Sequence, residues 1–359
     1  MTQEDHRFMG QALSLGRRGL GRVWPNPNVG CVIVQGGRVI GRGWTADGGR
    51  PHAETQALHG IDAQGATAYV TLEPCAHYGQ TPPCADALAK AGVARVVIAA
   101  PDPDPRVDGG GVAKLRAAGI TVETGVRRAE AERDMAGFLS CITRNRPFVT
   151  LKLAASFDGR IATATGESQW ITGQQARRHV HAMRMTHDAV LVGAGTVRAD
   201  DPTLTVRNLG AVRQPVRVVA SRKLKLDAPA MMAGVEAAPV WLCHADGAPV
   251  HSFVDQGAVS VPCKTQGQQI DPVDMMTKLA DAGLTRVYCE GGGKLAASLL
   301  NCDLVDEVVG YTAGLVIGAE GTPGLGAMGL ERLNAAPRFT LVDSRQIGAD
   351  LMHRWARHA

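Results

Sequence analysis

The sequence predicts two α/β domains in series, and three observations lead to this prediction. The chain has 359 residues, about twice the length of a typical domain. Short strand-like apolar runs alternate with helix-like segments through both halves, as in α/β folds. The alternation is interrupted at Arg144-Asn145-Arg146-Pro147, and a new strand-like run starts at Phe148. We therefore expect one domain over residues 1–146 and another over residues 147–359.

The first half opens with an amphipathic segment, residues 4–18, in which Phe8, Leu13 and Leu15 share one face. This spacing predicts a helix, and a proline-rich loop at residues 24–28 follows it. The strands predicted next are residues 29–34, 38–43, 67–72, 94–100 and 120–124. The helices predicted among them are residues 53–60, 84–91, 111–118 and 127–143. Strands that alternate with helices in this way predict a three-layer α/β unit.

The second half alternates in the same manner. Its predicted strands are residues 148–155, 189–192, 216–220, 240–243, 286–290 and 305–312. Its predicted helices are residues 173–185, 272–282 and 294–300. The pattern favours a second α/β domain.

Composition excludes several classes of protein. Hydrophobic residues make up 45% and charged residues 20%, as in an ordinary globular chain. No apolar run approaches the ~18 residues of a membrane span, and the polar start of the chain does not resemble a secretory signal. Aromatic residues make up only 4%, and no dense Lys/Arg run is present. We expect a cytoplasmic protein with no membrane and no nucleic-acid partner.

Eight cysteines are scattered along the chain, and without a secretory signal they indicate buried thiols or metal ligands. Two of them, Cys75 and Cys84, combine with His52 into a set that suits zinc. One imidazole and two thiolates leave the fourth position of zinc open to water, which is the catalytic arrangement. Glu54 need not bind the metal and suits a proton shuttle between that water and a leaving amine.

This set matches the zinc nucleobase-deaminase pattern, H-x-E followed by P-C, except that eight residues separate the two cysteines. Taken singly, His52 would be interpreted as a satisfied polar residue, and each cysteine as a buried thiol. Because the ligands follow predicted strands in proline-marked loops, the combination favours catalytic zinc.

Two glycine-rich loops follow predicted strands in the second half, Gly291-Gly292-Gly293 and Gly193-Ala194-Gly195. Backbone N–H groups at the start of a helix bind phosphate, although a tight turn gives the same pattern. Two such loops suit a dinucleotide. Neither is the G-x-G-x-x-G fingerprint, so an ordinary Rossmann domain is disfavoured.

Longer stretches resemble one family. P-N-P-N-V-G at residues 25–30, P-H-A-E at 51–54 and T-L-E-P-C-A-H-Y-G-Q-T-P-P-C at 71–84 are similar to the bacterial bifunctional riboflavin-biosynthesis deaminase/reductases. The long spacing between the cysteines is that family's own. Residues 152–160, 166–172 and 198–207 resemble the reductase half of the same family.

The resemblance implies a fold and two reactions. Residues 1–146 would be a cytidine-deaminase-like three-layer α/β/α domain, and residues 147–359 a dihydrofolate-reductase-like α/β domain. The first would remove the 2-amino group of 2,5-diamino-6-(5-phosphoribosylamino)pyrimidin-4(3H)-one as ammonia. The second would use NADPH to reduce the ribosyl group of 5-amino-6-(5-phosphoribosylamino)uracil to ribityl.

The resemblance also implies the site residues. Zn²⁺ would be held by His52, Cys75 and Cys84, with Glu54 as the catalytic shuttle, and Asn26 and His77 would line the base pocket. The implied NADPH contacts are Ala154, Trp170, Thr196, Asp200, Ser221, Gly292, Gly293, Lys294, Leu295, Ala296, Ala297 and Ser298. The implied contacts to the phosphorylated pyrimidine are Ser168, Arg184, Leu204, Arg207 and Glu290.

Arg184 and Arg207 suit a ribose 5′-phosphate, and Ser221-Arg222-Lys223 suits the adenosine 2′-phosphate. Alone, Arg184 would be a solvated helix residue, and the second set a basic turn. His179, His181 and His187 are interpreted as surface or packing residues.

The chain departs from the family at Gln80, where Lys or Arg is common, and at Asp104, where Asn is usual. Both departures concern substrate contacts and leave the metal set intact.

Other functions need features that this sequence lacks. A nucleic-acid base deaminase would need a basic groove with stacking aromatics, and a structural zinc module would need a fourth ligand. A nucleotide deaminase with an inactive nucleotide-binding second domain is the main alternative, and the intact Lys152, Asp200 and Glu290 speak against it. The sequence does not determine whether the protein is a homo-oligomer.

Overall fold

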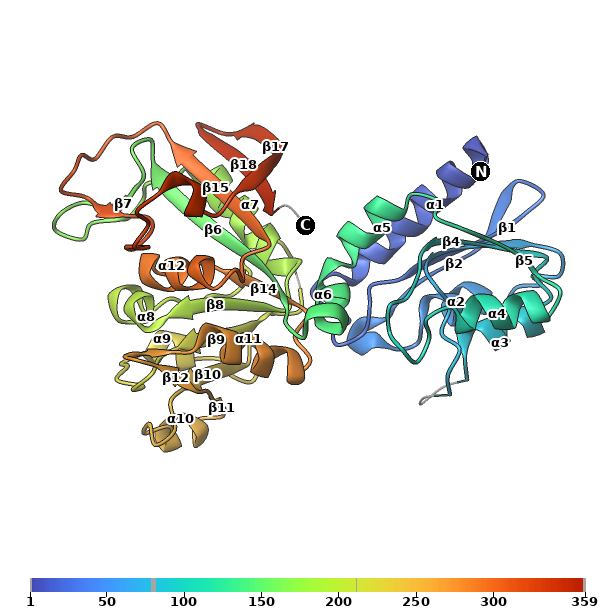
Figure 1. Cartoon of the computed structure of the whole chain (residues 1–359), viewed down its shortest axis with the longest axis horizontal. Coiled ribbons are helices and arrows are strands. Elements are labelled where there is room, and N and C mark those ends of the chain that lie inside the picture. The colour runs from blue at the N-terminus through green and yellow to red at the C-terminus, as the bar shows by residue number, and fades with distance from the viewer. Residues whose placement is uncertain (1, 79–81, 211, 358–359) are drawn as a thin grey trace. The chain divides into compact units, whose positions relative to one another are not determined.

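The computed structural model describes residues 2–78, 82–210 and 212–357. The chain forms two compact units, residues 1–146 and residues 147–359, which are described separately below (Figure 1). Within the described residues, no helix has the length and apolar character needed to cross a membrane.

The first unit is built on a five-stranded sheet with the strand order β2-β1-β3-β4-β5. Its strands are β1 (Gly30–Gln35), β2 (Arg38–Trp44), β3 (Thr67–Leu72), β4 (Arg95–Ala100) and β5 (Thr121–Thr124). Strand β1 is antiparallel to both of its neighbours, whereas β3, β4 and β5 are parallel. The carboxyl ends of β3 and β4 therefore lie at the same edge of the sheet.

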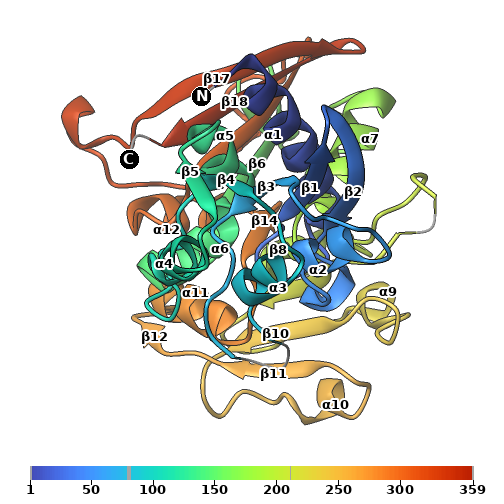
Figure 2. The same ribbon diagram turned by 90° about the vertical axis from the view of Figure 1, so that its right-hand side faces the viewer.

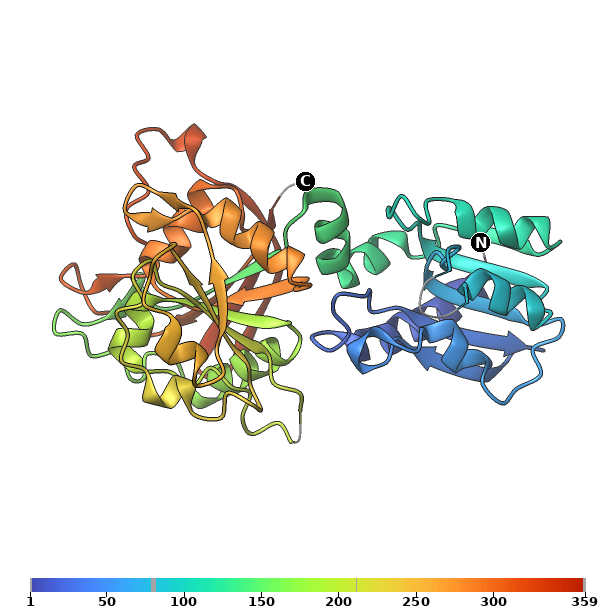
Figure 3. The same ribbon diagram turned by 90° about the horizontal axis from the view of Figure 1, so that it is seen from below.

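Helices cover both faces of this sheet. The helices are α1 (Gln3–Gly16), α2 (Ala53–Leu58), α3 (Cys84–Lys90), α4 (Gly110–Ala117), α5 (Arg128–Asp134) and α6 (Ala136–Arg144). Helices α1 and α5 pack on one face, and α2 packs on the other with α3 and α4 beside it; Figure 3 shows the latter three from their own side. The prediction of a three-layer α/β unit is confirmed.

The start of helix α1 is explained by its capping residues. Thr2 and Asp5 form a capping box, each side chain accepting the other's backbone N–H, which satisfies two of the open donors of the first turn. Phe8, Met9 and Leu13 are buried against the sheet. The single helix predicted at residues 127–143 is wrong, because the backbone of Met135 leaves helical geometry (φ −98°, ψ 12°) and separates α5 from α6. The Met135 side chain is buried in the core at this bend.

The second unit is built on a nine-stranded sheet with the order β11-β10-β9-β8-β14-β6-β15-β18-β17. Its strands are β6 (Phe148–Ser156), β8 (Ala189–Gly193), β9 (Val216–Ala220), β10 (Val240–His244), β11 (Val259–Pro262), β14 (Arg286–Cys289), β15 (Glu307–Ala313), β17 (Phe339–Ile347) and β18 (Asp350–Arg357). The seven strands from β11 to β15 are parallel. The apolar runs of the inner strands β8, β9, β10 and β14 are buried, as expected where helices cover a parallel sheet.

The main helices of this unit are α7 (Gln174–Met185), α8 (Ala194–Asp200), α11 (Pro272–Asp281) and α12 (Gly293–Asn301). Short elements complete it: α9 (Pro229–Met232), α10 (His251–Val254), and the pairs β7 (Arg160–Ala162) with β16 (Thr322–Pro323) and β12 (Thr265–Gln266) with β13 (Gln269–Ile270). Because β8, β9 and β14 are parallel neighbours, the segments that follow them meet at one sheet edge, where ligands of α/β folds bind.

The C-terminal hairpin of β17 and β18, which forms one edge of the sheet (red in Figure 2), is absent from the predicted elements. Strand β17 is mostly exposed and carries no buried apolar run. A signal was present, however, in the two-residue connection Gly348-Ala349, where Gly348 has a positive φ of 65°. Such two-residue turns with glycine join antiparallel strands.

Candidate functional site

The fold brings His52, Cys75 and Cys84 together from three segments. His52 immediately precedes α2, Cys75 follows β3 and Cys84 begins α3. The His52 Nδ1 atom lies 3.3 Å from Cys84 Sγ and 3.8 Å from Cys75 Sγ. Two ligands of a tetrahedral zinc, at about 2.0 Å for nitrogen and 2.3 Å for sulfur, lie about 3.6 Å apart. The three atoms all lie within 4.8 Å of one another, and among the described residues they are a set that could hold one metal ion.

The charge state of this cluster also suits a metal. The hydrogen bond from the Cys84 thiol lowers the pKa of Cys75 to about 4, and His52 and the Cys84 backbone N–H lower it further. The hydrogen bond to Cys75 raises the pKa of His52. Cys84 is the protonated partner, since its bond to Cys75 raises the pKa of its thiol. A site that already stabilises one thiolate favours the binding of a cation, which displaces the protons of the other ligands.

Glu54 lies in the first turn of α2, next to this cluster. Its side chain is buried, and it interacts with Cys84, Cys75 and His52. Burial raises the pKa of Glu54 to about 6. A carboxyl group whose pKa lies near the working pH both accepts and returns a proton readily.

The loops around the cluster carry the other residues predicted for the first unit. Asn26 donates to the Gly49 carbonyl at 2.8 Å, which fixes the orientation of its amide. His77 is partly buried, and no described residue accepts from or donates to its buried Nδ1. The pKa of the nearby Asp104 carboxyl is lowered chiefly by its hydrogen bond from Arg106, and His77 adds to this effect. Gln80 lies outside the described residues.

Asp104 is buried, and Arg106 holds its carboxylate with both Nε (2.9 Å) and Nη2. The backbone N–H of Arg106 donates to the same oxygen as its Nε, at 2.9 Å. The negative charge that Asp104 introduces in place of Asn is therefore neutralised by Arg106.

In the second unit, the two glycine-rich loops lie against each other. A Cβ atom at Gly291 would come within 2.8 Å of Val192 and 3.0 Å of the Thr196 hydroxyl. Gly292 has a positive φ of 78° and precedes α12. Only glycine permits this close approach and this backbone conformation.

Beside these loops, Arg184 and Glu290 form a two-point ion pair. Arg184 Nε and Nη2 both donate to Glu290, the latter at 3.0 Å, and the two side chains are only 11% and 8% exposed. Burial alone would raise the pKa of Glu290, but Arg184 outweighs this effect and the pKa is lowered. Lys152 interacts with both Glu290 and Asp200, while desolvation lowers the pKa of its ammonium group.

The remaining residues predicted for the second unit differ in how far they are exposed to solvent. Arg207 and Trp170 are exposed, and the Arg177 guanidinium lies 4.3 Å from the centre of the Trp170 ring. Leu204, Ala296 and Ala297 are each only 3% exposed, so they present little surface to a ligand. Ser221 is also buried, and its hydroxyl accepts from Leu224 N–H at 3.1 Å.

One residue that the sequence analysis set aside lies among these groups. His181 is on α7, one turn before Arg184, and its Nδ1 accepts from the backbone N–H of Arg207 at 3.2 Å. The (i, i+3) spacing of His181 and Arg184 on one helix was the available signal. By contrast, His187 is buried and bonded to Thr150 and Met183, as a packing residue is.

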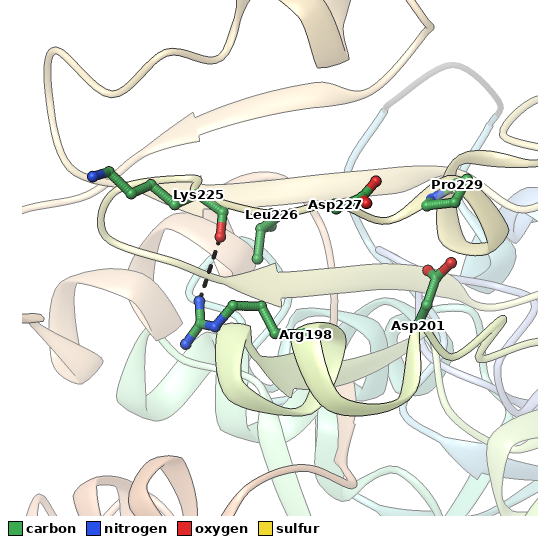
Figure 4. A pocket seen from close by; sticks show the side chains of 6 residues that line it. All are labelled: Arg198, Asp201, Lys225, Leu226, Asp227 and Pro229. Carbon is green, nitrogen blue, oxygen red and sulfur yellow. Dashed lines mark hydrogen bonds between the residues drawn. The ribbon is translucent and has the colours of Figure 1, made fainter.

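A separate cavity of about 680 Å³ opens between α8 and the segment that follows β9 (Figure 4). It is lined by Arg198, Asp201, Lys225, Leu226, Asp227 and Pro229. The Asp201 carboxylate is already bonded to the backbone N–H groups of Ala230 and Met231. No lining residue belongs to the predicted contact set, although Thr196 and Asp200 lie on the same helix.

Comparisons with known proteins cover both halves of the chain. Residues 2–100 match the model of the cytidine and deoxycytidylate deaminase zinc-binding region, and residues 147–353 match that of the RibD C-terminal domain. The riboflavin biosynthesis protein RibD of Escherichia coli K12 is 40% identical, over 97% of this chain and 98% of that protein. RibD of Bacillus amyloliquefaciens is 41% identical, over 97% and 95%.

Solved structures agree with these matches. Acinetobacter baumannii RibD superposes with a TM-score of 0.90 at 40% identity, with 99% of both chains covered. The diaminohydroxyphosphoribosylaminopyrimidine deaminase/5-amino-6-(5-phosphoribosylamino)uracil reductase of Thermotoga maritima gives 0.88 at 35% identity, again with 99% of both chains covered. The chain therefore belongs to the RibD family of riboflavin biosynthesis proteins, and it is an enzyme with a zinc-binding deaminase region and a RibD reductase domain.

Proposed function

We propose that residues 1–146 deaminate 2,5-diamino-6-(5-phosphoribosylamino)pyrimidin-4(3H)-one and that residues 147–359 reduce the product with NADPH. The Thermotoga maritima relative is named for these two activities, and this chain matches it along 99% of its length. Within the chain itself, the observation that carries the proposal is the cluster of His52, Cys75 and Cys84 beside the buried Glu54.

In the first unit, His52, Cys75 and Cys84 would hold zinc, which would activate a water molecule for attack on C2 of the pyrimidine. Glu54 takes a proton from that water and passes it to the 2-amino group, which leaves as ammonia. Asn26 and His77 line the base pocket. The bond from Asn26 to the Gly49 carbonyl leaves its amide oxygen to accept from the base.

In the second unit, NADPH would supply the hydride that turns C1′ of the ribosyl group into the methylene of a ribityl chain. The glycine turn at the start of α12 suits the pyrophosphate, because backbone N–H groups at the start of a helix bind phosphate. A side chain at Gly291 would collide with Val192 and Thr196, so only glycine fits this turn. Ser221 and Arg222 face the 2′-phosphate.

The substrate contacts of the second unit are Ser168, Arg184, Leu204, Arg207 and Glu290. The paired Arg184 and Glu290 offer the remaining guanidinium N–H groups and carboxylate lone pairs to ribose hydroxyls. Arg207 is exposed and suits the phosphate.

The substrates are small phosphorylated pyrimidines, and the place of action is the cytoplasm. The basic excess of 38 Lys and Arg over 34 Asp and Glu suits anionic metabolites.

The test is product analysis by mass spectrometry. With the diaminopyrimidine alone, the zinc-loaded enzyme should release ammonia and accumulate the uracil intermediate. On addition of NADPH, the intermediate should gain two hydrogens. An unchanged diaminopyrimidine would refute the deaminase half, and an intermediate that persists with NADPH would refute the reductase half.

A further inference from the structure

The segment that carries Arg207 is attached to α7 at two points. The His181 ring accepts the backbone N–H of Arg207 through Nδ1 at 3.2 Å. One turn further along α7, Arg184 Nη1 donates to the Thr205 carbonyl at 2.8 Å. These two bonds hold the backbone immediately before the exposed Arg207 side chain.

Arg184 itself has little charge to offer to a phosphate. Glu290 accepts from two of its nitrogens, and Thr205 accepts from the third. Both members of the pair are almost fully buried, so their charges largely cancel within the site. Removing Arg184 would leave the buried Glu290 carboxylate without its hydrogen-bonded partner and with only the more distant charge of Lys152, which is costly.

Arg207 differs from Arg184, because its side chain is exposed. Within the described part of the chain, its backbone N–H donates to His181. Burial, together with the nearby Arg184 and Arg207, lowers the pKa of His181. The imidazole is therefore neutral near pH 7, and its Nδ1 lone pair remains available to the Arg207 N–H.

We infer that His181 is a positioning residue of the reductase site, which fixes the segment at residues 205–207 so that Arg207, rather than Arg184, takes the substrate phosphate. This inference rests on the proposed function and adds to it a residue and a division of labour between the two arginines. Since His181 acts through Arg207, its loss should weaken recognition of the phosphate and leave hydride transfer intact.

The experiment compares His181→Asn with His181→Gln in the full-length enzyme. The oxygen of Asn, at the δ position, takes the place of imidazole Nδ1, whereas the oxygen of Gln lies one atom further out. Gln is the better helix former, so a defect confined to the Gln variant would not come from a weakened α7. Arg178→Ala, on the exposed part of the same helix, is the control.

Steady-state NADPH oxidation is measured with the phosphorylated uracil intermediate and with the same compound after phosphatase treatment. His181→Gln should raise KM for the phosphorylated compound about threefold to tenfold, the value of one hydrogen bond. Its kcat should not change, nor should its KM for the dephosphorylated compound. His181→Asn and Arg178→Ala should behave as the parent enzyme does.

Equal behaviour of the Asn and Gln variants would overturn the inference, as would equal losses on both compounds. A parent enzyme that handles both compounds alike would overturn it too, because no phosphate recognition would then exist to be positioned. If the parent enzyme oxidised no NADPH with either compound, the proposed function itself would fail, which is a different outcome.

Discussion

Cys75 and Cys84 show how far single residues could be interpreted before the fold was known. The H-x-E and P-C patterns predicted a set of zinc ligands and a shuttle, because zinc chemistry restricts both residue type and local spacing. The structure adds what no local pattern contains, namely that His52, just before α2, and Cys84, the first residue of α3, lie with their Nδ1 and Sγ atoms 3.3 Å apart. His181 was missed since its partner is a backbone group 26 residues away in sequence.

At this scale, Cys75→Ser or Cys84→Ser should abolish zinc binding and deamination, because a hydroxyl replaces a thiolate ligand. Metal content and ammonia release measure the effect. Cys141→Ser, in α6 of the same unit, makes the same chemical change away from the cluster and should leave both unchanged. Full zinc content with normal ammonia release in both ligand variants would end the zinc assignment.

Glu54→Gln should retain zinc and lose about a hundredfold to ten-thousandfold of the deamination rate, because the amide carries no proton between water and the leaving nitrogen. Zinc content and initial rates of ammonia release are the measurements. Reduction of the intermediate that has already been deaminated serves as the internal control and should proceed normally. Deamination at the parental rate would assign the shuttle to another residue.

Cofactor choice gives a third prediction for single residues. The enzyme should prefer NADPH to NADH, and Arg222→Ala should weaken NADPH binding about tenfold to hundredfold through loss of a charge-assisted bond. Arg222 Nη2 donates to Gln268 Oε1 at 2.8 Å. Affinity for NADH, measured by fluorescence titration, should hardly change. Equal losses for both cofactors would mean that Arg222 supports the loop only.

At the scale of elements, strongly patterned segments were predicted well and weakly patterned ones were not. Residues 67–72 form β3 as predicted, because a strand that is buried on both faces is largely apolar and β-branched. The bend at Met135 and the exposed β17 depend on tertiary packing and on an edge position, which hydrophobic periodicity does not record.

The ion pair between Asp5 of α1 and Arg95 of β4 predicts how the stability of the first unit changes in acid. Asp5 is 1% exposed and accepts from Arg95 at 2.8 Å and from the Tyr69 hydroxyl at 3.0 Å. The bond from Arg95 places the pKa of Asp5 well below its usual range. A carboxyl group with a lowered folded-state pKa stabilises the fold above its unfolded pKa, about 4, and loses this effect as the pH falls through the folded value.

Asp5→Asn should therefore lower the free energy of unfolding at pH 7 by about 1.5–3 kcal/mol, the contribution of hydrogen bonds to a charged group. Urea denaturation at several pH values measures it. The difference from the parent should shrink below about pH 4. Glu4→Gln, in the same turn but exposed, is the matched control and should change little. A pH-independent difference for Asp5→Asn would show that shape, not charge, is responsible.

At the scale of the whole molecule, the sequence predicted two α/β domains because the alternation of strands and helices restarts after Pro147. The order of the nine strands in the second sheet could not be predicted from the sequence, because strands far apart in the chain, such as β6 and β15, pair with each other. Each unit has its own core, and units of this kind often fold separately.

A fragment of residues 147–359 should thus fold and reduce the deaminated intermediate with NADPH. Circular dichroism and NADPH oxidation are the measurements. The full-length Glu54→Gln enzyme, in which the first unit is present but inactive, provides the comparison. A folded fragment that binds neither NADPH nor the intermediate would contradict the assignment of reduction to this unit.

The most direct test of the two-reaction account is the stoichiometry of the parent enzyme. Purified protein loaded with zinc is given the diaminopyrimidine and NADPH, and ammonia and NADP⁺ are measured together. The account predicts one ammonia and one NADP⁺ for each substrate consumed, with no NADPH oxidation when zinc is removed and its return when the deaminated intermediate is supplied. Ammonia release without any NADPH oxidation, or NADPH oxidation from the diaminopyrimidine without ammonia, would contradict it.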